Sequence, residues 1–286
     1  MKKIFFIGNR ASVFKEIEHN CEEFMVVKIV AVQDSFLSRY LDKQKKKYIV
    51  LDSKEDLIDE IKKTEFDYLI SNGCPYILPI SKLKKSDERY INIHPSLLPE
   101  LKGKHPINGA YLLNKPFGVT CHYMNDKVDD GEIIAQINVG MPYSINLEFA
   151  YKLLFRIEGE VFKKSIKCGF KVTKQIDNIK DTYYSRDEKD LIFNFNMDID
   201  EILKIIKAFS IESIMSRFYY KDRLFKVLDA DVIKLDYLEK IKEKFRENEI
   251  IYVLDNDLII KKSNKILHLK HIEGQMDTFK EEELLI

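Results

Sequence analysis

The chain has 286 residues, of which 45% are hydrophobic and 33% charged, proportions that are ordinary for a soluble globular protein. Lys plus Arg and Asp plus Glu each total 47, so the formal net charge is zero. The chain as a whole therefore lacks the basic excess that is typical of nucleic-acid-binding proteins. It has no apolar run approaching about 18 residues and no recognisable leader. We therefore expect a cytoplasmic protein without a membrane span.

The four cysteines are scattered, with no CxxC or other metal-ligand spacing. Such a pattern indicates reduced thiols of an intracellular protein rather than disulfides. Neither these cysteines nor any other motif predicts a metal.

In chain order, the first half alternates strand and helix patterns. Apolar, β-branched runs predict strands at Lys3–Ile7, Met25–Val32, Tyr48–Leu51, Tyr68–Ser71, Tyr90–His94, Gly118–Met124 and Ile133–Val139. Helical spacing predicts helices at Ser12–His19, at Asp56–Lys62 and from about Leu147 to Val161. This alternation favours an α/β fold, a Rossmann-like and mostly parallel sheet with helices on both faces.

Beyond about residue 190 the pattern changes. Asp198 is a candidate cap for a helix that carries Ile199, Leu203 and Ile206 on one face. From Phe218 onward, short strand-like runs alternate with polar turns, as in a small OB-like barrel. We expect a catalytic domain at residues 1–190, a linker near 170–195 and a small β-rich domain at 191–286.

Ligands of open parallel sheets bind where strands end. The turn after the first strand contains Gly8 but no full GxGxxG, so a dinucleotide cofactor is not supported. The turn after Tyr68–Ser71 reads SNGCPYILP, a Gly- and Pro-containing loop whose backbone could face a flat heterocycle. An ordinary strand-to-helix turn would have the same composition.

The next strand ends in Asn92-Ile93-His94. Residues two apart in a strand face the same side, so an amide donor and an imidazole project together, as acyl-type transfer requires. Asp129, in the turn Asp129-Asp130-Gly131, would fix the tautomer of His94 if it reached that ring. A purely structural Asn-x-His pair and a plain Asp-Gly turn fit the spacing equally well.

The stretch Asn92–Gln136 decides between these interpretations. It reads NIHPSLLPELKGKHPINGAYLLNKPFGVTCHYMNDKVDDGEIIAQ and resembles the signature of the folate-dependent formyltransferases. That family includes methionyl-tRNA formyltransferase, glycinamide ribonucleotide transformylase and the sugar N-formyltransferases. Its likeness extends less sharply over Met1–Cys168, and Asp198–Gly274 is similar to the C-terminal domain of the longer members.

The resemblance implies that 10-formyltetrahydrofolate is the formyl donor and that Asn92, His94 and Asp129 are catalytic. Asn92 and protonated His94 would stabilise the oxyanion, while Asp129 holds the imidazole. The implied pterin pocket, formed largely by backbone atoms, includes Cys74, Tyr76, Ile77, Leu78, Asn125, Lys127 and Val128.

The expected acceptor contacts are Arg10, Ser96, Lys102, Gly103, Lys104 and Asn108. Arg10, Lys102 and Lys104 lie in turns at the carboxyl edge of the predicted sheet, where they could contact the two phosphates of a nucleotide-linked sugar. Solvated loop charges would fit Lys102 and Lys104 equally well. Lys102-Gly103 replaces the family's usual Arg-Gly, which keeps the charge but loses a planar two-pronged contact. Two observations favour a nucleotide-linked amino sugar over methionyl-tRNA as the acceptor. Residues 191–286 contain 16 Lys or Arg against 19 Asp or Glu, and the stretch between Met25–Val32 and Tyr48–Leu51 is short for a tRNA enzyme.

The neutral charge makes a nucleic-acid partner less favoured without excluding it. The tRNA enzyme therefore stays as an alternative, and so does a non-catalytic folate or nucleotide-sugar binding module. A glycinamide ribonucleotide transformylase would end before the second domain, and a formyltetrahydrofolate hydrolase would carry an extra regulatory domain. The resemblance also suggests a homodimer.

Overall fold

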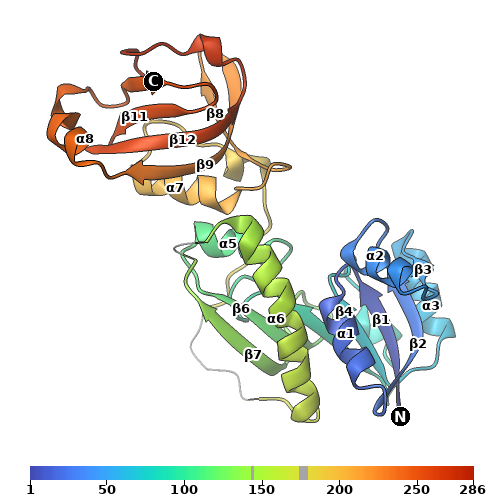
Figure 1. The fold of residues 1–286 in the computed structure, drawn as a ribbon. Coiled ribbons are helices and arrows are strands. Elements are labelled where there is room, and N and C mark those ends of the chain that lie inside the picture. Colours follow the sequence, from blue (N-terminus) through green and yellow to red (C-terminus); the bar gives the residue numbers. More distant parts are fainter. Residues whose placement is uncertain (143–144, 174–179) are drawn as a thin grey trace. The chain divides into compact units, whose positions relative to one another are not determined.

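The computed structural model describes residues 1–142, 145–173 and 180–286 (Figure 1). It divides into two compact units. The first contains Met1–Pro106, Pro116–Met141 and Tyr151–Tyr184, and the second contains Ile107–Lys115, Pro142–Ala150 and Ser185–Ile286. Part of the expected linker at 170–195 lies outside the described residues. Within those residues, no helix is both long and apolar enough to cross a membrane.

The first unit is built on a seven-stranded sheet. Its strands are β1 (Lys2–Gly8), β2 (Phe24–Ala31), β3 (Ile49–Val50), β4 (Tyr68–Asn72), β5 (Arg89–His94), β6 (Phe117–Tyr123) and β7 (Ile133–Gly140). The strand order is β3-β2-β1-β4-β5-β6-β7. Strands β1 to β5 pair in parallel, whereas β6 and β7 add an antiparallel edge. The prediction of a mostly parallel sheet is confirmed.

Helices cover both faces of this sheet, as predicted. They are α1 (Ser12–His19), α2 (Phe36–Lys43), α3 (Lys54–Lys63), α4 (Ile80–Leu83) and α6 (Leu147–Lys167), whereas α5 (Pro106–Leu112) lies from Ile107 onward in the second unit. On one face, Phe5 of β1 shares a buried cluster with Leu57 of α3. On the other face, Phe6 meets Phe14 of α1 with ring centroids 5.2 Å apart. Alternate residues of β1 therefore anchor opposite helix layers.

Helix α2 was not predicted. It begins behind Ser35, whose hydroxyl accepts from the Ser38 backbone while the Ser38 hydroxyl accepts from the Ser35 backbone. This reciprocal pair is a capping box made of two serines rather than the usual Ser and Glu. The two serines therefore look like an ordinary polar turn in the sequence.

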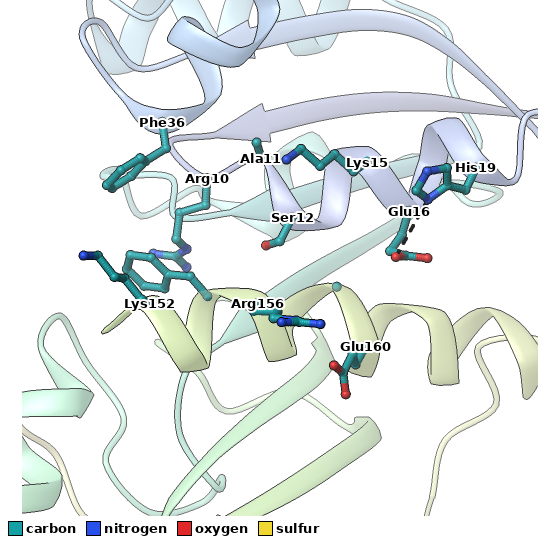
Figure 2. A pocket seen from close by; sticks show the side chains of 12 residues that line it. Arg10, Ala11, Ser12, Lys15, Glu16, His19, Phe36, Lys152, Arg156 and Glu160 are labelled. Carbon is teal, nitrogen blue, oxygen red and sulfur yellow. Dashed lines mark ion pairs between the residues drawn. The ribbon is translucent and has the colours of Figure 1, made fainter. Parts of the chain in front are cut away.

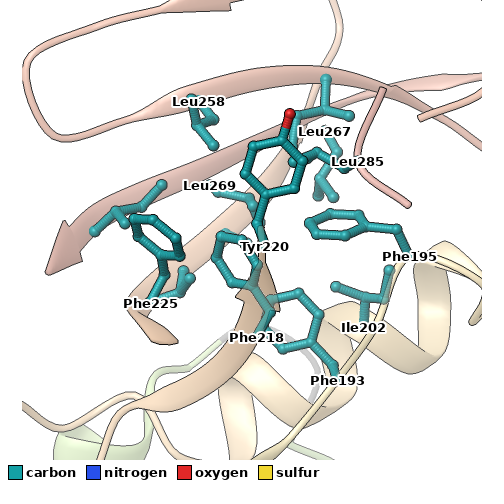
Figure 3. Close-up of a cluster of buried hydrophobic side chains, with 14 of the residues drawn as sticks. Phe193, Phe195, Ile202, Phe218, Tyr220, Phe225, Leu258, Leu267, Leu269 and Leu285 are labelled. Atoms are coloured by element: carbon teal, nitrogen blue, oxygen red, sulfur yellow. The ribbon is translucent and has the colours of Figure 1, made fainter. Parts of the chain in front are cut away.

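The second unit contains a five-stranded antiparallel sheet, which confirms the predicted β-rich C-terminal region. Its order is β10-β11-β12-β9-β8, and its strands are β8 (Ser216–Tyr220), β9 (Arg223–Ile233), β10 (Ile250–Val253), β11 (Leu258–Lys262) and β12 (Lys265–Glu273). The predicted helix is α7 (Ile199–Ala208), capped by the Asp198 carboxylate; α8 (Asp236–Ile241) follows β9. An aromatic core joins α7 to the sheet (Figure 3), with Phe218 stacked on Phe225 at 5.4 Å.

Candidate active site

The carboxyl end of β5 carries the Asn-x-His pair. Backbone pairing sets Asn92 opposite His122 and His94 opposite Thr120 of β6. The His94 side chain is buried, whereas Asn92 is half-buried. β5 therefore holds an amide and an imidazole on one face of the sheet, as predicted from their spacing.

The loop between β6 and β7 brings Asp129 to this pair. Its Oδ1 accepts from Asn92 Nδ2 at 3.3 Å, and its Oδ2 lies 3.5 Å from His94 Nδ1. The Gly103 backbone N–H donates to the same Oδ2 at 2.9 Å. Gly131 lets the loop fold back, since a Cβ there would lie 1.8 Å from the Tyr123 carbonyl oxygen. The three residues named from the sequence thus meet at one carboxylate.

The protein fixes the tautomers of the two nearby imidazoles. His94 Nε2 lies 2.9 Å from the Leu101 carbonyl oxygen, so this nitrogen carries the hydrogen and Nδ1 is left to face Asp129. His122 Nδ1 lies 2.8 Å from the Tyr123 carbonyl, so its Nε2 accepts from Asn92 Nδ2 at 3.2 Å. A proton that reaches His94 will therefore reside on Nδ1, beside the carboxylate.

Burial and neighbouring charges shift the pKa values of His94 and Asp129 in opposite directions. Burial lowers the pKa of His94 below its usual value, although the Asp129 carboxylate opposes this shift. For Asp129, burial would raise the pKa, but the imidazoles of His94 and His122 and the Gly103 N–H lower it well below the usual range. At neutral pH the carboxylate is therefore anionic and His94 of the free protein is neutral.

The predicted acceptor residues fall into different surroundings. Lys102 is buried and its ammonium contacts the carboxylates of Asp130 and Asp181. Ser96 is buried and donates to the Glu100 carbonyl at 2.8 Å. Asn108 belongs to the second unit, where its amide donates to the Ala208 carbonyl at 2.7 Å. Gly103 contacts Asp129, and Lys104 is exposed. Acceptor contacts by these residues stay predictions.

Arg10 has a partner that the sequence analysis missed. Its Nε donates to Glu158 Oε2 of α6 at 2.9 Å, and its Nη2 lies 2.9 Å from Oε1 as an ion pair. The Glu158 side chain is 0% exposed, and burial raises its pKa even though Arg10 lowers it. The signal was present, because Glu158 lies on the same helical stripe as buried Leu154 and Val161. A glutamate on the buried, apolar face of a helix indicates a cationic partner, because a buried carboxylate is costly unless it is paired.

A cavity of about 500 Å³ opens between α1 and α6 (Figure 2). Its walls carry basic and aromatic groups together with two glutamates, and Gly159 of α6 lies close to α1. The lining residues are Arg10, Ala11, Ser12, Lys15, Glu16, His19, Phe36, Lys152, Phe155, Arg156, Gly159 and Glu160. The Arg10 guanidinium lies 4.7 Å from the centre of the Phe155 ring. Such a cavity has the size and the polar groups of a ligand site.

The two loops of the implied pterin pocket are joined. Asp126 accepts from the Ser81 backbone N–H at 2.9 Å, which ties the loop after β6 to α4. Cys74 and Tyr76 pack on the same buried cluster as Leu78, whereas Ile77 is 61% exposed. Asn125, Lys127 and Val128 lie on the loop that carries Asp129. Folate binding by these residues stays a prediction. No metal-binding cluster occurs in the described ranges.

The sequence of this chain is similar to those of known proteins. The family model described as Formyl transferase matches residues 1–146. A methionyl-tRNA formyltransferase of Clostridium tetani is 25% identical over 299 aligned positions, which cover 96% of this chain and 92% of the relative. A second methionyl-tRNA formyltransferase, from Caldicellulosiruptor saccharolyticus, is 24% identical, covering 78% of this chain and 71% of the relative.

Solved structures show the same fold. An N-formyltransferase from Helicobacter canadensis, in complex with folinic acid and dTDP-3-aminofucose, superposes with a TM-score of 0.71 at 19% identity, over 96% of this chain and 100% of that one. A 4-N formyltransferase from Francisella tularensis gives 0.67 at 21% identity, over 82% and 99%. The family model spans β1 to β7 and thereby contains Asn92, His94 and Asp129. This chain is a member of the formyltransferase family.

Proposed function

We propose that the protein transfers the formyl group of 10-formyltetrahydrofolate to the amine of a nucleotide-linked amino sugar. The observation that carries this proposal is the Asp129 carboxylate, which contacts both Asn92 and His94 at the end of β5. Family membership supports formyl transfer, and the structural neighbours support a sugar acceptor.

The 10-formyl group supplies an electrophilic carbon, and residues of the chain take up the proton and stabilise the charges that develop around it. His94 is neutral and holds its hydrogen on Nε2, so Nδ1 takes up the proton that the attacking amine releases. Asp129 then stabilises the imidazolium. The two contacts of the Asn92 amide nitrogen, at 3.2 and 3.3 Å, are long, so the amide can turn toward a developing oxyanion at small cost.

The loops beside the trio suit a folate. A pterin is flat and has donors and acceptors along one edge, which the backbone groups of Cys74–Leu78 and Asn125–Val128 would bind. The exposed Ile77 side chain adds an apolar surface. The Ser81–Asp126 hydrogen bond joins α4, which follows the first loop, to the loop after β6, and such a tie would reduce the cost of ordering the two loops around a ligand.

The cavity between α1 and α6 suits the acceptor. A nucleotide-linked sugar carries two phosphates and a flat base. Lys152 and Arg156 line the cavity opposite Arg10, and Phe36, which is 63% exposed, offers a stacking surface. Arg10 follows the carboxyl end of β1, and His94 lies at the carboxyl end of β5 in the same sheet. A phosphate bound beside Arg10 would therefore lie at the same sheet edge as the trio.

A substrate screen tests this function. Tetrahydrofolate release is measured with nucleotide-linked amino sugars and with initiator methionyl-tRNA side by side, and His94→Ala serves as the blank. We expect release with at least one amino sugar. Release with methionyl-tRNA alone would replace the sugar acceptor, and no release with any amine would favour a binding module.

Methionyl-tRNA is the second candidate, because the two similar proteins from Clostridium tetani and Caldicellulosiruptor saccharolyticus are methionyl-tRNA formyltransferases. It predicts a basic surface that contacts polyanions. The marked basic run is Lys43–Lys47 at the end of α2, where Lys46 already pairs with Glu18 at 2.7 Å. Changing Lys43, Lys45, Lys46 and Lys47 to Gln should leave turnover on the true acceptor unchanged within about twofold, since these exposed charges are expected to contribute little. A large loss of turnover that shrinks as salt is raised would support the tRNA acceptor.

The pH dependence of the rate follows from His94. If neutral His94 takes up the amine proton, kcat/KM should rise with pH through the His94 pKa, which burial sets below its usual value. The Asp129 carboxylate opposes that lowering, so Asp129→Asn should move the acid limb to still lower pH, besides reducing the rate. Titration of the acceptor amine is common to both proteins, so the difference between the two profiles reports His94. An unmoved limb would assign it to another group.

A further inference from the structure

Lys102 is a buried cation with two carboxylate partners. Its residue is 2% exposed, and its Nζ contacts Asp130 and lies 2.6 Å from Asp181 Oδ2. Burial alone would lower the pKa of this ammonium, but the hydrogen bonds to Asp130 and Asp181 raise it above its usual value. The side chain is therefore charged and committed to partners within the first unit.

The backbone around Lys102 is held by the chain segment 181–184, which we call the clamp segment. Lys102 N–H donates to the Thr182 carbonyl at 2.8 Å, and Tyr184 N–H donates to the Lys102 carbonyl at 2.8 Å. Leu101 N–H donates to Thr182 Oγ1 at 2.8 Å. The clamp segment thus runs parallel to residues 101–103 as a short two-stranded bridge.

The residues on either side of Lys102 contact the trio directly. The Leu101 carbonyl accepts from His94 Nε2 at 2.9 Å, and Gly103 N–H donates to Asp129 Oδ2 at 2.9 Å. Leu101 has a φ of +58°, which is uncommon for a residue with a side chain and persists where its surroundings hold it. The backbone on both sides of Lys102 therefore sets the orientation of His94 and Asp129.

The side chain of Lys102 also contacts the loop that carries Asp129. Asp130 follows Asp129 in the β6–β7 loop, so the Lys102–Asp130 pair ties that loop to residues 101–103. Tyr183 of the clamp segment strengthens the tie, because its hydroxyl donates to the Val128 carbonyl at 3.3 Å. One buried ammonium thus joins three segments that are distant in sequence.

We propose that Lys102 is a positioning residue: held between Asp130 and Asp181, it fixes the loop of Asp129 against the backbone that orients His94. This inference rests on the proposed function of the trio. It gives Lys102 a role other than the acceptor-phosphate contact that the sequence analysis implied.

The test is Lys102→Met, which removes the charge and keeps an unbranched side chain. Misplacing a catalytic group by about 1 Å can cost about 100-fold in rate, so we expect kcat to fall by about 10- to 100-fold. KM for both substrates should stay within about twofold. The acid limb of kcat/KM should move to lower pH, because displacement of the loop moves the Asp129 carboxylate away from His94, and that carboxylate opposes the lowering of the His94 pKa. Lys102→Arg should restore most of kcat.

Lys262 of β11 provides the matched control. It is also buried, lies 3.0 Å from Glu247 Oε1, and donates to the Phe195 carbonyl at 2.7 Å in the second unit. Lys262→Met should lower Tm as Lys102→Met does, while kcat and the acid limb stay unchanged. A merely structural Lys102 would give the same result in both variants and would overturn the proposal. A rise in KM for the acceptor at constant kcat would return Lys102 to phosphate binding.

Nuclear magnetic resonance of the His94 ring separates this proposal from the proposed function. Nitrogen-15 shifts of His94 report its tautomer and titration without any turnover, so they remain informative if no acceptor is formylated. Lys102→Met should shift the His94 titration to lower pH, and an unchanged titration overturns the positioning role. If this variant does not fold, Asp181→Asn replaces it, since its half-exposed side chain can be changed without leaving a buried charge. The same shift, smaller in size, is expected, and its absence also counts against the proposal.

Discussion

Replacing His94 or Asn92 with alanine is expected to lower turnover by about two to four orders of magnitude, the range typical for loss of a proton carrier or an oxyanion donor. His94→Ala removes the nitrogen that faces Asp129 at 3.5 Å, and Asn92→Ala removes an amide 3.3 Å from the same carboxylate. The measurement is single-turnover tetrahydrofolate release at saturating acceptor, so that weakened binding does not enter the rate.

Two controls accompany this result. Tm of each variant establishes that the first unit is folded, and His271→Ala, an exposed histidine of the second unit, should retain the wild-type rate. Retention of turnover within about tenfold by either His94→Ala or Asn92→Ala would remove that residue from the catalytic assignment.

Arg10→Met is expected to destabilise the protein strongly. The Glu158 carboxylate is 0% exposed and Arg10 is 13% exposed, so the variant leaves a buried charge without its cation. Breaking such a pair typically costs about 3–5 kcal/mol. Glu158→Gln in the same chain removes the stranded charge, so Arg10→Met/Glu158→Gln should recover most of the lost free energy of unfolding. Urea unfolding of the two single variants and the double variant measures this.

The loss in Arg10→Met should also depend on pH. Burial raises the pKa of Glu158, and without Arg10 nothing at the guanidinium position opposes that shift. A group whose folded pKa lies above its unfolded value contributes most below the unfolded pKa, and this contribution is lost as pH rises through the folded pKa. The destabilisation should therefore be smaller near pH 4.5 than near pH 7.5. An equal loss at both pH values would mean that Glu158 stays charged.

The double variant Arg10→Met/Glu158→Gln, which recovers its stability, should still bind the acceptor weakly if Arg10 contacts the phosphates of the acceptor.

The fold could be predicted from local patterns because its strands are short apolar runs bounded by polar turn residues. Helix α2 was missed because the Ser35–Ser38 capping box looks like a polar turn. The antiparallel edge made by β6 and β7 depends on pairings between strands, which the local pattern of either strand does not specify.

The trio could be named because Asn92 and His94 lie two residues apart on one strand and the family signature includes Asp129. The contacts that hold the trio and the Arg10 turn in place could not be predicted from the sequence. Lys102 and Asp181 are separated by 79 positions and Arg10 and Glu158 by 148. No spacing rule joins such residues, and each of the two basic side chains is as compatible with a solvated loop or a phosphate as with a buried carboxylate.

The clamp segment also has a consequence for synthesis of the chain. Residues 89–94, 101–103 and 128–130 all lie within the 146 residues that match the family model, but residues 181–184 do not. As the chain leaves the ribosome, β5 with His94 and the loop with Asp129 are therefore synthesised before the clamp segment that contacts residues 101–103. During that interval, Lys102 has Asp130 but not Asp181. If Lys102 positions the trio as proposed, the site is completed only after the residues of α6 have been synthesised, close to the start of the last segment of the second unit at Ser185.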